Sequence, residues 1–201
     1  MRKRSRRRTD KQRGKKAGRK LFPCNGNDRI FTPDVLAFDI VSYIRPSGLI
    51  LEPSCGDGAF VRACRHLGLK CAWCEIDKGR DFFQCHPGRR YDYIIGNPPY
   101  SLFTPFLEHS LEVADNVVFL SPVASWFQRA RERIIASAGF GILEIVHVPV
   151  PPPPWPPFGF SLGVAWLRRG WTGATQFTRL PSQLWPPNGG DKMVIPVKES
   201  L

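Results

Sequence analysis

Leu49-Ile50-Leu51-Glu52-Pro53-Ser54-Cys55-Gly56-Asp57-Gly58-Ala59-Phe60 is the stretch that decides the fold of this chain. It opens with a short apolar run typical of a buried strand and continues into a helical pattern from Ala59 to Leu67. Glycines between a strand and a helix let the backbone turn tightly and let a ligand approach it. The spacing is neither that of a Walker loop nor the G-x-G-x-x-G of dinucleotide-binding proteins. The pattern predicts a strand, a turn and a helix, and by itself it also fits a turn with a purely structural role.

The same alternation continues on both sides of this stretch. Upstream, Thr32 and Pro33 are typical of a helix start, and apolar residues then recur at helical spacing from Val35 to Ile44. Downstream we expect strands at 69–75, 91–95, 117–120, 142–148 and 162–167, and helices at 103–115 and 123–138. This order predicts an α/β fold with a Rossmann-like, doubly wound, mostly parallel sheet and helices on both faces. No helix separates the last two strands, so we expect an antiparallel hairpin at an edge.

The net charge of +12 is concentrated at the N-terminus. Residues 1–20 hold 12 Lys and Arg and one Asp, whereas residues 21–201 are nearly neutral, which excludes a uniformly basic, histone-like protein. We expect a disordered basic arm over 1–20, a folded domain over 21–168 and an irregular extension over 169–201. Such an arm binds phosphate backbones through its charge, although a solvated tail or a nuclear-import signal has the same composition.

The six cysteines and the apolar segments bear on the compartment. No apolar run approaches the roughly 18–20 residues of a membrane-spanning helix, and no apolar signal segment follows the basic N-terminus. The cysteines lie mostly in strand-like runs, which favours reduced thiols in a cytoplasmic protein, or a nuclear one in a eukaryote. Cys71 and Cys74 would point to opposite faces of such a run, so we expect no metal site.

Two further clusters follow expected strands. Glu75 stands about 20 residues after the glycine turn, where doubly wound sheets place an acid that binds ribose hydroxyls. Asn97-Pro98-Pro99-Tyr100 follows the strand at 91–95, and its two prolines remove two N–H donors. The Asn amide oxygen and the nearby carbonyls then form a stiff acceptor array that suits an exocyclic amine. A solvated strand end and an ordinary Asn-Pro turn are the structural alternatives.

These clusters, in this order, resemble the gamma class of S-adenosylmethionine-dependent DNA methyltransferases that act on adenine N6. The Asn97–Tyr100 tetrapeptide matches the signature of amino-group methyltransferases, and the glycine turn matches the first cofactor motif. Phe31, Thr32 and Pro33 resemble the motif that contacts the methionine end of the cofactor. Asp81-Phe82 resembles the motif whose acid binds the cofactor's adenine amine. The resemblance covers roughly residues 31–168 and implies that the domain over 21–168 is catalytic.

The resemblance also implies a role for each matching residue. The amino-acid part of S-adenosylmethionine would be surrounded by Glu52, Cys55, Gly56 and Gly58, its ribose held by Glu75, and its adenine by Asp81 and Phe82. Asn97 would also contact the cofactor. The target amine would meet Asn97, Pro98 and Pro99, with Tyr100 stacking on the base, and Phe158 or Phe160 covering its other face. The reaction would be direct methyl transfer to adenine in DNA. A base inside a duplex cannot reach such a pocket, so it would be flipped out.

The chain departs from the family in two places. Five residues separate Glu75 from Asp81, too few for a parallel crossover, so either the third strand is vestigial or Asp81 lies on a loop. No separate target-recognition domain is visible. Arg129, Arg131 and Arg133 could contact a nucleic acid or form an ordinary solvated surface.

Two other functions stay open. The same core could methylate an amine of adenine or guanine in RNA, or a protein glutamine. It could also be an inactive nucleic-acid-binding subunit.

Overall fold

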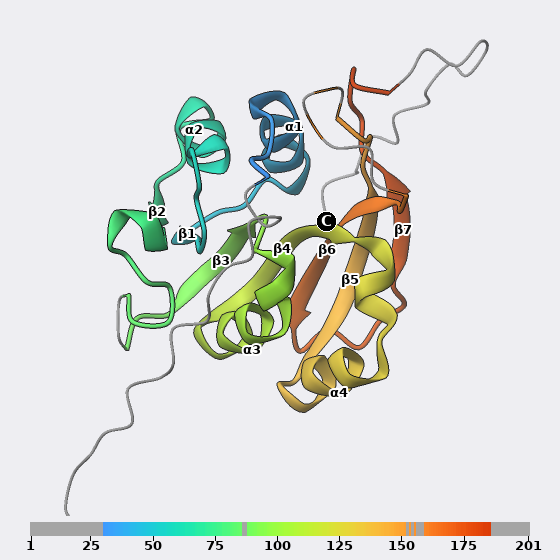
Figure 1. The fold of residues 1–201 in the computed structure, drawn as a ribbon. Coiled ribbons are helices and arrows are strands. Elements are labelled where there is room, and N and C mark those ends of the chain that lie inside the picture. The colour runs from blue at the N-terminus through green and yellow to red at the C-terminus, as the bar shows by residue number, and fades with distance from the viewer. Residues whose placement is uncertain (1–29, 86–87, 152, 154, 156–158, 186–201) are drawn as a thin grey trace, which may run out of the picture.

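The computed structural model describes residues 30–85, 88–151, 153, 155 and 159–185, so the basic arm predicted over 1–20 lies outside the described residues. These residues form one sheet of seven strands in the spatial order β2-β1-β3-β4-β6-β5-β7, with helices on both sides (Figure 1). The strands are β1 (Ile50–Glu52), β2 (Cys71–Trp73), β3 (Tyr91–Gly96), β4 (Ala114–Pro122), β5 (Phe140–His147), β6 (Leu162–Arg169) and β7 (Gln176–Arg179). The predicted Rossmann-like α/β architecture is confirmed.

Strand directions confirm the mostly parallel sheet and correct one position within it. β2, β1, β3 and β4 pair in parallel, as do β5 and β7, whereas β6 is antiparallel to both β4 and β5. The expected antiparallel pair therefore exists, but its position at an edge is wrong, because β6 lies between β4 and β5 and β7 lies outside β5. β6 is buried at most of its positions, and an inner place satisfies both of its backbone edges. The mostly exposed β7 suits the edge instead.

The helices divide between the two faces of the sheet. α1 (Asp34–Ile44) and α2 (Ala59–His66) cover one face, and α3 (Phe103–Val113) and α4 (Arg129–Ser137) cover the other. Successive strand residues alternate between the two cores: Ile95 packs with α1 and α2, and Ile94 packs with α3. This period of two along each strand is what allows a strand buried on both faces to serve two helix layers.

Two predicted helices differ in detail. α1 begins at Asp34 rather than Pro33, because Pro33 has an extended ψ of 142° and is the residue before the helix. Thr32 makes no capping bond and is buried instead. The helix expected over 123–138 is split into a 3₁₀ segment, Val123–Phe127, and α4, with Gln128 extended between them. Trp126 lies in the 3₁₀ segment and is fully buried, with its ring packed against that of Phe103. This burial favours the break over a continuous helix.

Two connections also correct expectations. Residues 169–201 are not irregular throughout, since Arg169 ends β6 and Gln176–Arg179 form β7. Between β2 and β3 the described residues hold a 3₁₀ turn at Ile76–Lys78, an isolated bridge and a loop, with no further strand. Asp81 therefore lies on a loop, which is the second of the two alternatives that the short Glu75–Asp81 spacing left open. Within the described part of the chain, no helix combines the length and apolar character needed to cross a membrane.

Candidate functional site

A cavity of about 310 Å³ lies at the carboxyl ends of β1, β2 and β3. Open α/β sheets bind ligands at this edge, and the volume is at the lower end of the ~300–1,000 Å³ usual for ligand pockets. Its lining combines the segments that follow these strands with the residues before α1 and the start of α2. Leu102 and Phe106, just before and within α3, complete it. The lining residues are 30–32, 52–57, 59–60, 75–78, 81–84, 97, 99, 102 and 106.

Two positions of the turn after β1 require glycine. Gly56 has a φ of +52°, and a Cβ atom there would lie 2.8 Å from Cδ1 of the Phe31 ring. Its N–H donates to the Glu75 carboxylate at 2.7 Å. Gly58, with a φ of +99°, immediately precedes α2. The turn therefore needs glycine both for its left-handed backbone and for the close approach of Phe31.

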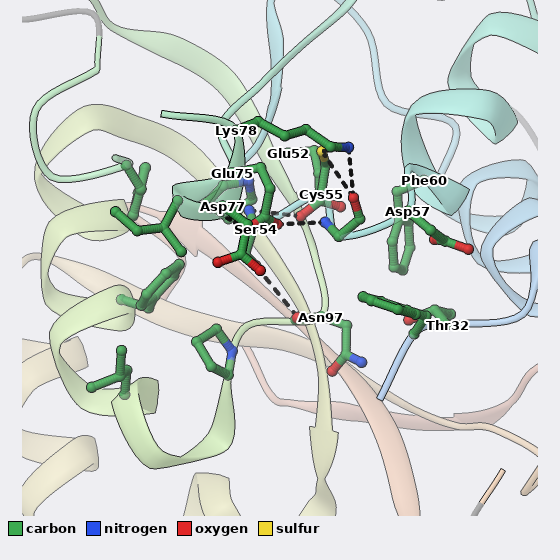
Figure 2. Close-up of a pocket in the computed structure, with 18 of the residues that line it drawn as sticks. Thr32, Glu52, Ser54, Cys55, Asp57, Phe60, Glu75, Asp77, Lys78 and Asn97 are labelled. Carbon is green, nitrogen blue, oxygen red and sulfur yellow. Dashed lines mark hydrogen bonds between the residues drawn. The ribbon is translucent and has the colours of Figure 1, made fainter. Parts of the chain in front are cut away.

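The segment after β2 is fastened to this turn. Lys78 Nζ donates to the Gly56 carbonyl at 2.7 Å and lies 3.8 Å from Cys55 Sγ, and Figure 2 shows its side chain arching over the turn. Glu75 also accepts the Asp77 N–H at 3.2 Å, which starts the 3₁₀ turn. Glu75 thus joins two segments of the lining through its two carboxylate oxygens, as expected of a residue that shapes the site as well as lining it.

Glu52 is a buried acid at the end of β1. It is 1% exposed and accepts the Ser54 N–H at 3.1 Å. Burial raises the pKa of Glu52 well above its usual range, and this effect outweighs the lowering by the Ser54 N–H. A positively charged ligand group beside Glu52 would reverse this balance by favouring the ionised carboxylate.

Asn97 supplies an acceptor without a partner. Its side-chain Oδ1 is buried and receives no hydrogen bond from any described residue, while its backbone carbonyl accepts from the Ser54 hydroxyl at 3.4 Å. Figure 2 shows Asn97 among the labelled residues of the lining, at the end of β3. Because a buried acceptor without a donor is costly, its place in the cavity wall points to a donor carried by a ligand.

Tyr100 begins the 3₁₀ turn Tyr100–Leu102 that follows the two prolines. Its hydroxyl is buried and makes no hydrogen bond with the described residues, and burial raises the pKa of Tyr100. Tyr100 and Pro98 do not line the cavity, whereas Asn97 and Pro99 do. The tetrapeptide therefore meets the cavity with its first and third residues.

Most of the predicted cofactor residues come together here. The cavity is lined by Phe31, Thr32, Glu52, Cys55, Gly56, Glu75, Asp81, Phe82 and Asn97, and not by Pro33 or Gly58. Phe160 is also not part of the lining, and Phe158 lies outside the described residues. The structure thus brings together residues from five separate segments of the sequence, and the role of each stays a prediction.

The Asp81 loop is held by its own hydrogen bonds. Asp81 accepts the Phe83 N–H at 3.0 Å and the Gln84 side-chain amide at 2.9 Å. Phe82 is 3% exposed and packs against Phe106 of α3, with ring centroids 5.2 Å apart. A loop of this kind places Asp81 at the cavity without the strand that a longer crossover would provide.

The cavity lining is strongly acidic. Among the described residues that line it, five are Asp or Glu and one, Lys78, is a cation. Sequence reasoning missed several of these residues, among them Ser54, Phe60, Ile76, Asp77 and Lys78. The position of Glu75 at a strand end could have pointed to the three residues that follow it, since they continue along the same edge of the sheet.

Other proteins share parts of this chain. No family model matches the sequence. The chain is 30% identical over 96 residues to a protein named Type II methyltransferase M.TthHB8I from Thermus thermophilus, and the match covers 39% of this chain. It covers 22% of that relative, so the chain spans about a fifth of the relative's length.

Three solved structures share the fold at low identity. A Listeria monocytogenes protein described as a class I S-adenosylmethionine-dependent methyltransferase has a TM-score of 0.57 and 14% identity, covering 77% of this chain and 67% of that one. A type I restriction-modification methyltransferase subunit from Streptococcus thermophilus has a TM-score of 0.51 and 14% identity, covering 75% of this chain and 47% of that one. A Pyrococcus horikoshii protein described as an RNA methyltransferase has a TM-score of 0.54 and 15% identity, covering 69% of this chain and 82% of that one. The chain therefore has the fold of the class I S-adenosylmethionine-dependent methyltransferases, as the predicted fold class requires.

Proposed function

We propose that this chain is an S-adenosylmethionine-dependent methyltransferase that modifies the exocyclic N6 amine of adenine in DNA. The observation that carries the proposal is the buried Oδ1 of Asn97 in the wall of the cavity, which has no hydrogen-bond partner among the described residues. An amine donates hydrogen bonds, and an acceptor fixed by two following prolines is suited to receive them. The relative that is named a type II methyltransferase supports the choice of DNA.

The acidic lining fits the cofactor. S-adenosylmethionine carries a sulfonium and an ammonium group, and five carboxyl side chains against one lysine favour a cationic ligand. We assign Glu52, Cys55 and the glycine turn to its amino-acid part, together with Phe31, Thr32 and Pro33. Glu75 is assigned to the ribose hydroxyls, and Asp81 with Phe82 to the adenine. When bound, the cofactor supplies an electrophilic methyl group.

The residues of the chain position the target amine. Asn97 Oδ1 and the Pro98 carbonyl accept its two N–H groups, which orients the nitrogen lone pair toward the methyl group and increases its electron density. The methyl group would pass directly from the cofactor's sulfur to this nitrogen, which breaks the sulfur–methyl bond and leaves S-adenosylhomocysteine. The methylated nitrogen would then lose a proton to water, so no covalent nucleophile is required from the protein. Tyr100, and Phe158 or Phe160 from the loop before β6, are proposed to stack on the flipped base.

The test is methyl transfer from labelled S-adenosylmethionine to DNA, RNA and protein in parallel. We expect N6-methyladenine in DNA, and we expect Asn97→Ala to lower its rate at least ~100-fold, as removal of an oriented acceptor or donor does in other enzymes. Thermal unfolding serves as the folding control for this variant, and calorimetry measures its cofactor binding separately. Label in RNA or protein instead of DNA would keep the chemistry and overturn the substrate, and absence of cofactor binding in the unmodified chain would overturn the enzyme itself.

A further inference from the structure

Charge is divided unevenly between the two halves of the described chain. Residues 30–122, which form the cavity, carry eight Lys and Arg against eleven Asp and Glu. Residues 123–185 carry six Arg against two Glu, and one of these, Glu144, is 1% exposed. The half of the molecule beyond β4 therefore presents a positive charge to an anionic partner.

Two phenylalanine rings in this basic half are exposed. Phe127, which follows β4, exposes 51% of its surface, and Phe177 on β7 exposes 66%. Their ring centroids are 6.4 Å apart and their planes differ by 15°, so residues fifty positions apart make one near-parallel aromatic pair. In Figure 1 the yellow chain leading into α4 lies beside β7, consistent with this contact. Exposed apolar groups that gather in this way mark interaction surfaces.

Each phenylalanine of this pair has an arginine two residues further along the chain. Arg179 is two residues after Phe177 on β7 and points to the same face, and its guanidinium lies 3.9 Å from the ring centroid of Trp185. Arg129, two residues after Phe127, is exposed at the start of α4. Arg131 is different, because it donates to the Ser125 carbonyl at 2.8 Å and lies over the Phe103 ring. Flat rings beside exposed guanidinium groups are the combination that binds single-stranded nucleic acids.

The pair lies toward the same edge of the sheet as Asn97. Phe127 follows the carboxyl end of β4, and Phe177 pairs with Ile145 near the carboxyl end of β5. β7 is four strands away from β3, whose end carries Asn97, which is about 19 Å at ~4.8 Å per strand. A single nucleic-acid strand with one base at Asn97 would therefore reach the Phe127–Phe177 pair within a few nucleotides.

We propose that Phe127, Phe177, Arg129 and Arg179, called here the Phe127–Phe177 surface, bind nucleotides that flank the target base in an unpaired DNA strand. The inference rests on the proposed function for the target site. Aromatic rings stack on the faces of bases, and these faces are accessible in a single strand, whereas a duplex presents phosphates and base edges. The surface therefore favours single-stranded or locally opened DNA over an intact duplex.

The test compares binding of a fluorescent, adenine-containing single-stranded oligonucleotide and of its duplex to the full chain by anisotropy. Measurements at elevated salt reduce the contribution of the charges in residues 1–20. We expect the double variant Phe127→Ala/Phe177→Ala to bind the single strand about tenfold or more weakly, with little change for the duplex. Leu67→Ala, which removes an exposed apolar side chain after α2, is the matched control and should bind as the unmodified chain does.

A second variant tests the charge. Arg179→Gln should reduce the slope of log affinity against log salt by about 0.7 for the single strand, and Arg179→Lys should keep it. A cofactor-induced rise in Tm confirms that each variant is folded. Unchanged single-strand affinity in the double phenylalanine variant, or an equal loss for the duplex, overturns the inference. If the unmodified chain binds cofactor but no DNA at any salt, the proposed DNA substrate fails, and this inference fails with it.

Discussion

Gly96 and Glu52 face each other so closely that a Cβ atom on Gly96 would lie 2.2 Å from Oε1 of Glu52. Gly96 ends β3 and is followed by Asn97, whereas Glu52 ends the neighbouring β1. Because Gly96 has no side chain, the buried carboxyl group of Glu52 can lie directly beside the segment that carries Asn97, whose Oδ1 has no partner in the described part of the chain. The proposed cofactor and target parts of the candidate site share this contact.

Gly96→Ala should accordingly disturb both parts. The added methyl group displaces the Glu52 carboxyl group, which has little room to move because it is 1% exposed, and overpacking of this kind costs ~1–3 kcal/mol. We expect a lower Tm and at least ~10-fold weaker binding of S-adenosylmethionine by calorimetry, since ~1.4 kcal/mol corresponds to tenfold. Gly159→Ala is the matched control, because among the described residues no atom beyond those of its chain neighbours lies within 4 Å of the Cβ position there. Equal cofactor affinity in the two variants would contradict the role of the contact.

Cofactor affinity should rise with pH. In the unfolded chain Glu52 loses its proton near pH 4.5. Because its pKa is raised in the folded protein, the folded protein keeps this proton between about pH 4.5 and the folded pKa. Over that window stability without cofactor falls as pH rises. A cationic cofactor favours the ionised carboxylate, so binding releases the proton and tightens by at most ~10-fold per pH unit.

The measurement is calorimetric titration across this window in two buffers of different ionisation enthalpy, which counts the protons released. Glu52→Gln keeps the shape of the side chain and removes the titration, so its affinity should be independent of pH in this range. A pH slope that persists in Glu52→Gln would assign the effect to another group.

Two substitutions separate the contribution of the Tyr100 ring from that of its hydroxyl. Because the hydroxyl is buried without a partner among the described residues, Tyr100→Phe should keep the activity and leave stability unchanged or raise it by up to ~1 kcal/mol. Tyr100→Ala should lower both the methyl-transfer activity and the stability, since the ring supports the turn after Pro99. Thermal unfolding and methyl-transfer rates on the two variants check this, and a large loss of activity in Tyr100→Phe would instead assign the hydroxyl a direct role.

α1 is joined to the outer strands by a buried carboxyl group. The Tyr43 hydroxyl donates to Glu144 Oε1 at 2.6 Å, and the Thr178 hydroxyl of β7 donates to the same atom at 2.7 Å. Tyr43→Phe removes one donor and should destabilise the fold by ~1–3 kcal/mol in chemical denaturation. Ser42→Ala is the neighbouring control, since the Ser42 hydroxyl is buried without a partner among the described residues and its loss should be neutral.

Tyr43 also makes a prediction for alkaline pH. Burial, followed by the hydrogen bond to Glu144, raises the pKa of Tyr43 from 10.0 to about 12. Its stabilising effect is therefore complete below pH 10 and is lost as pH rises from 10 to about 12. Unfolding midpoints should fall less steeply across this range in Tyr43→Phe than in the unmodified chain, and identical slopes would contradict the assignment.

The order of strands, turns and helices could be predicted because each depends on neighbours in the chain. The apolar run at 49–51, the glycines that follow it and the helical period from Ala59 determined that element whatever surrounds it. The same local logic placed Glu52, Glu75 and Asn97 at strand ends. Parallel strands end at one edge, so the meeting of these residues in one cavity could be expected from the sequence.

Only the tertiary structure decided which strands are neighbours. β6 lies inside the sheet and β7 at its edge, because burial on both faces and pairing along both edges depend on the whole sheet. The contacts of Gly96 with Glu52 and of Phe127 with Phe177 join residues more than forty positions apart, and no local pattern encodes such a distance. The sequence by itself determined most of the elements and the motif residues, whereas β7 and the break in the helix expected over 123–138 depend on packing. The packing of the elements also determined how the motif residues meet.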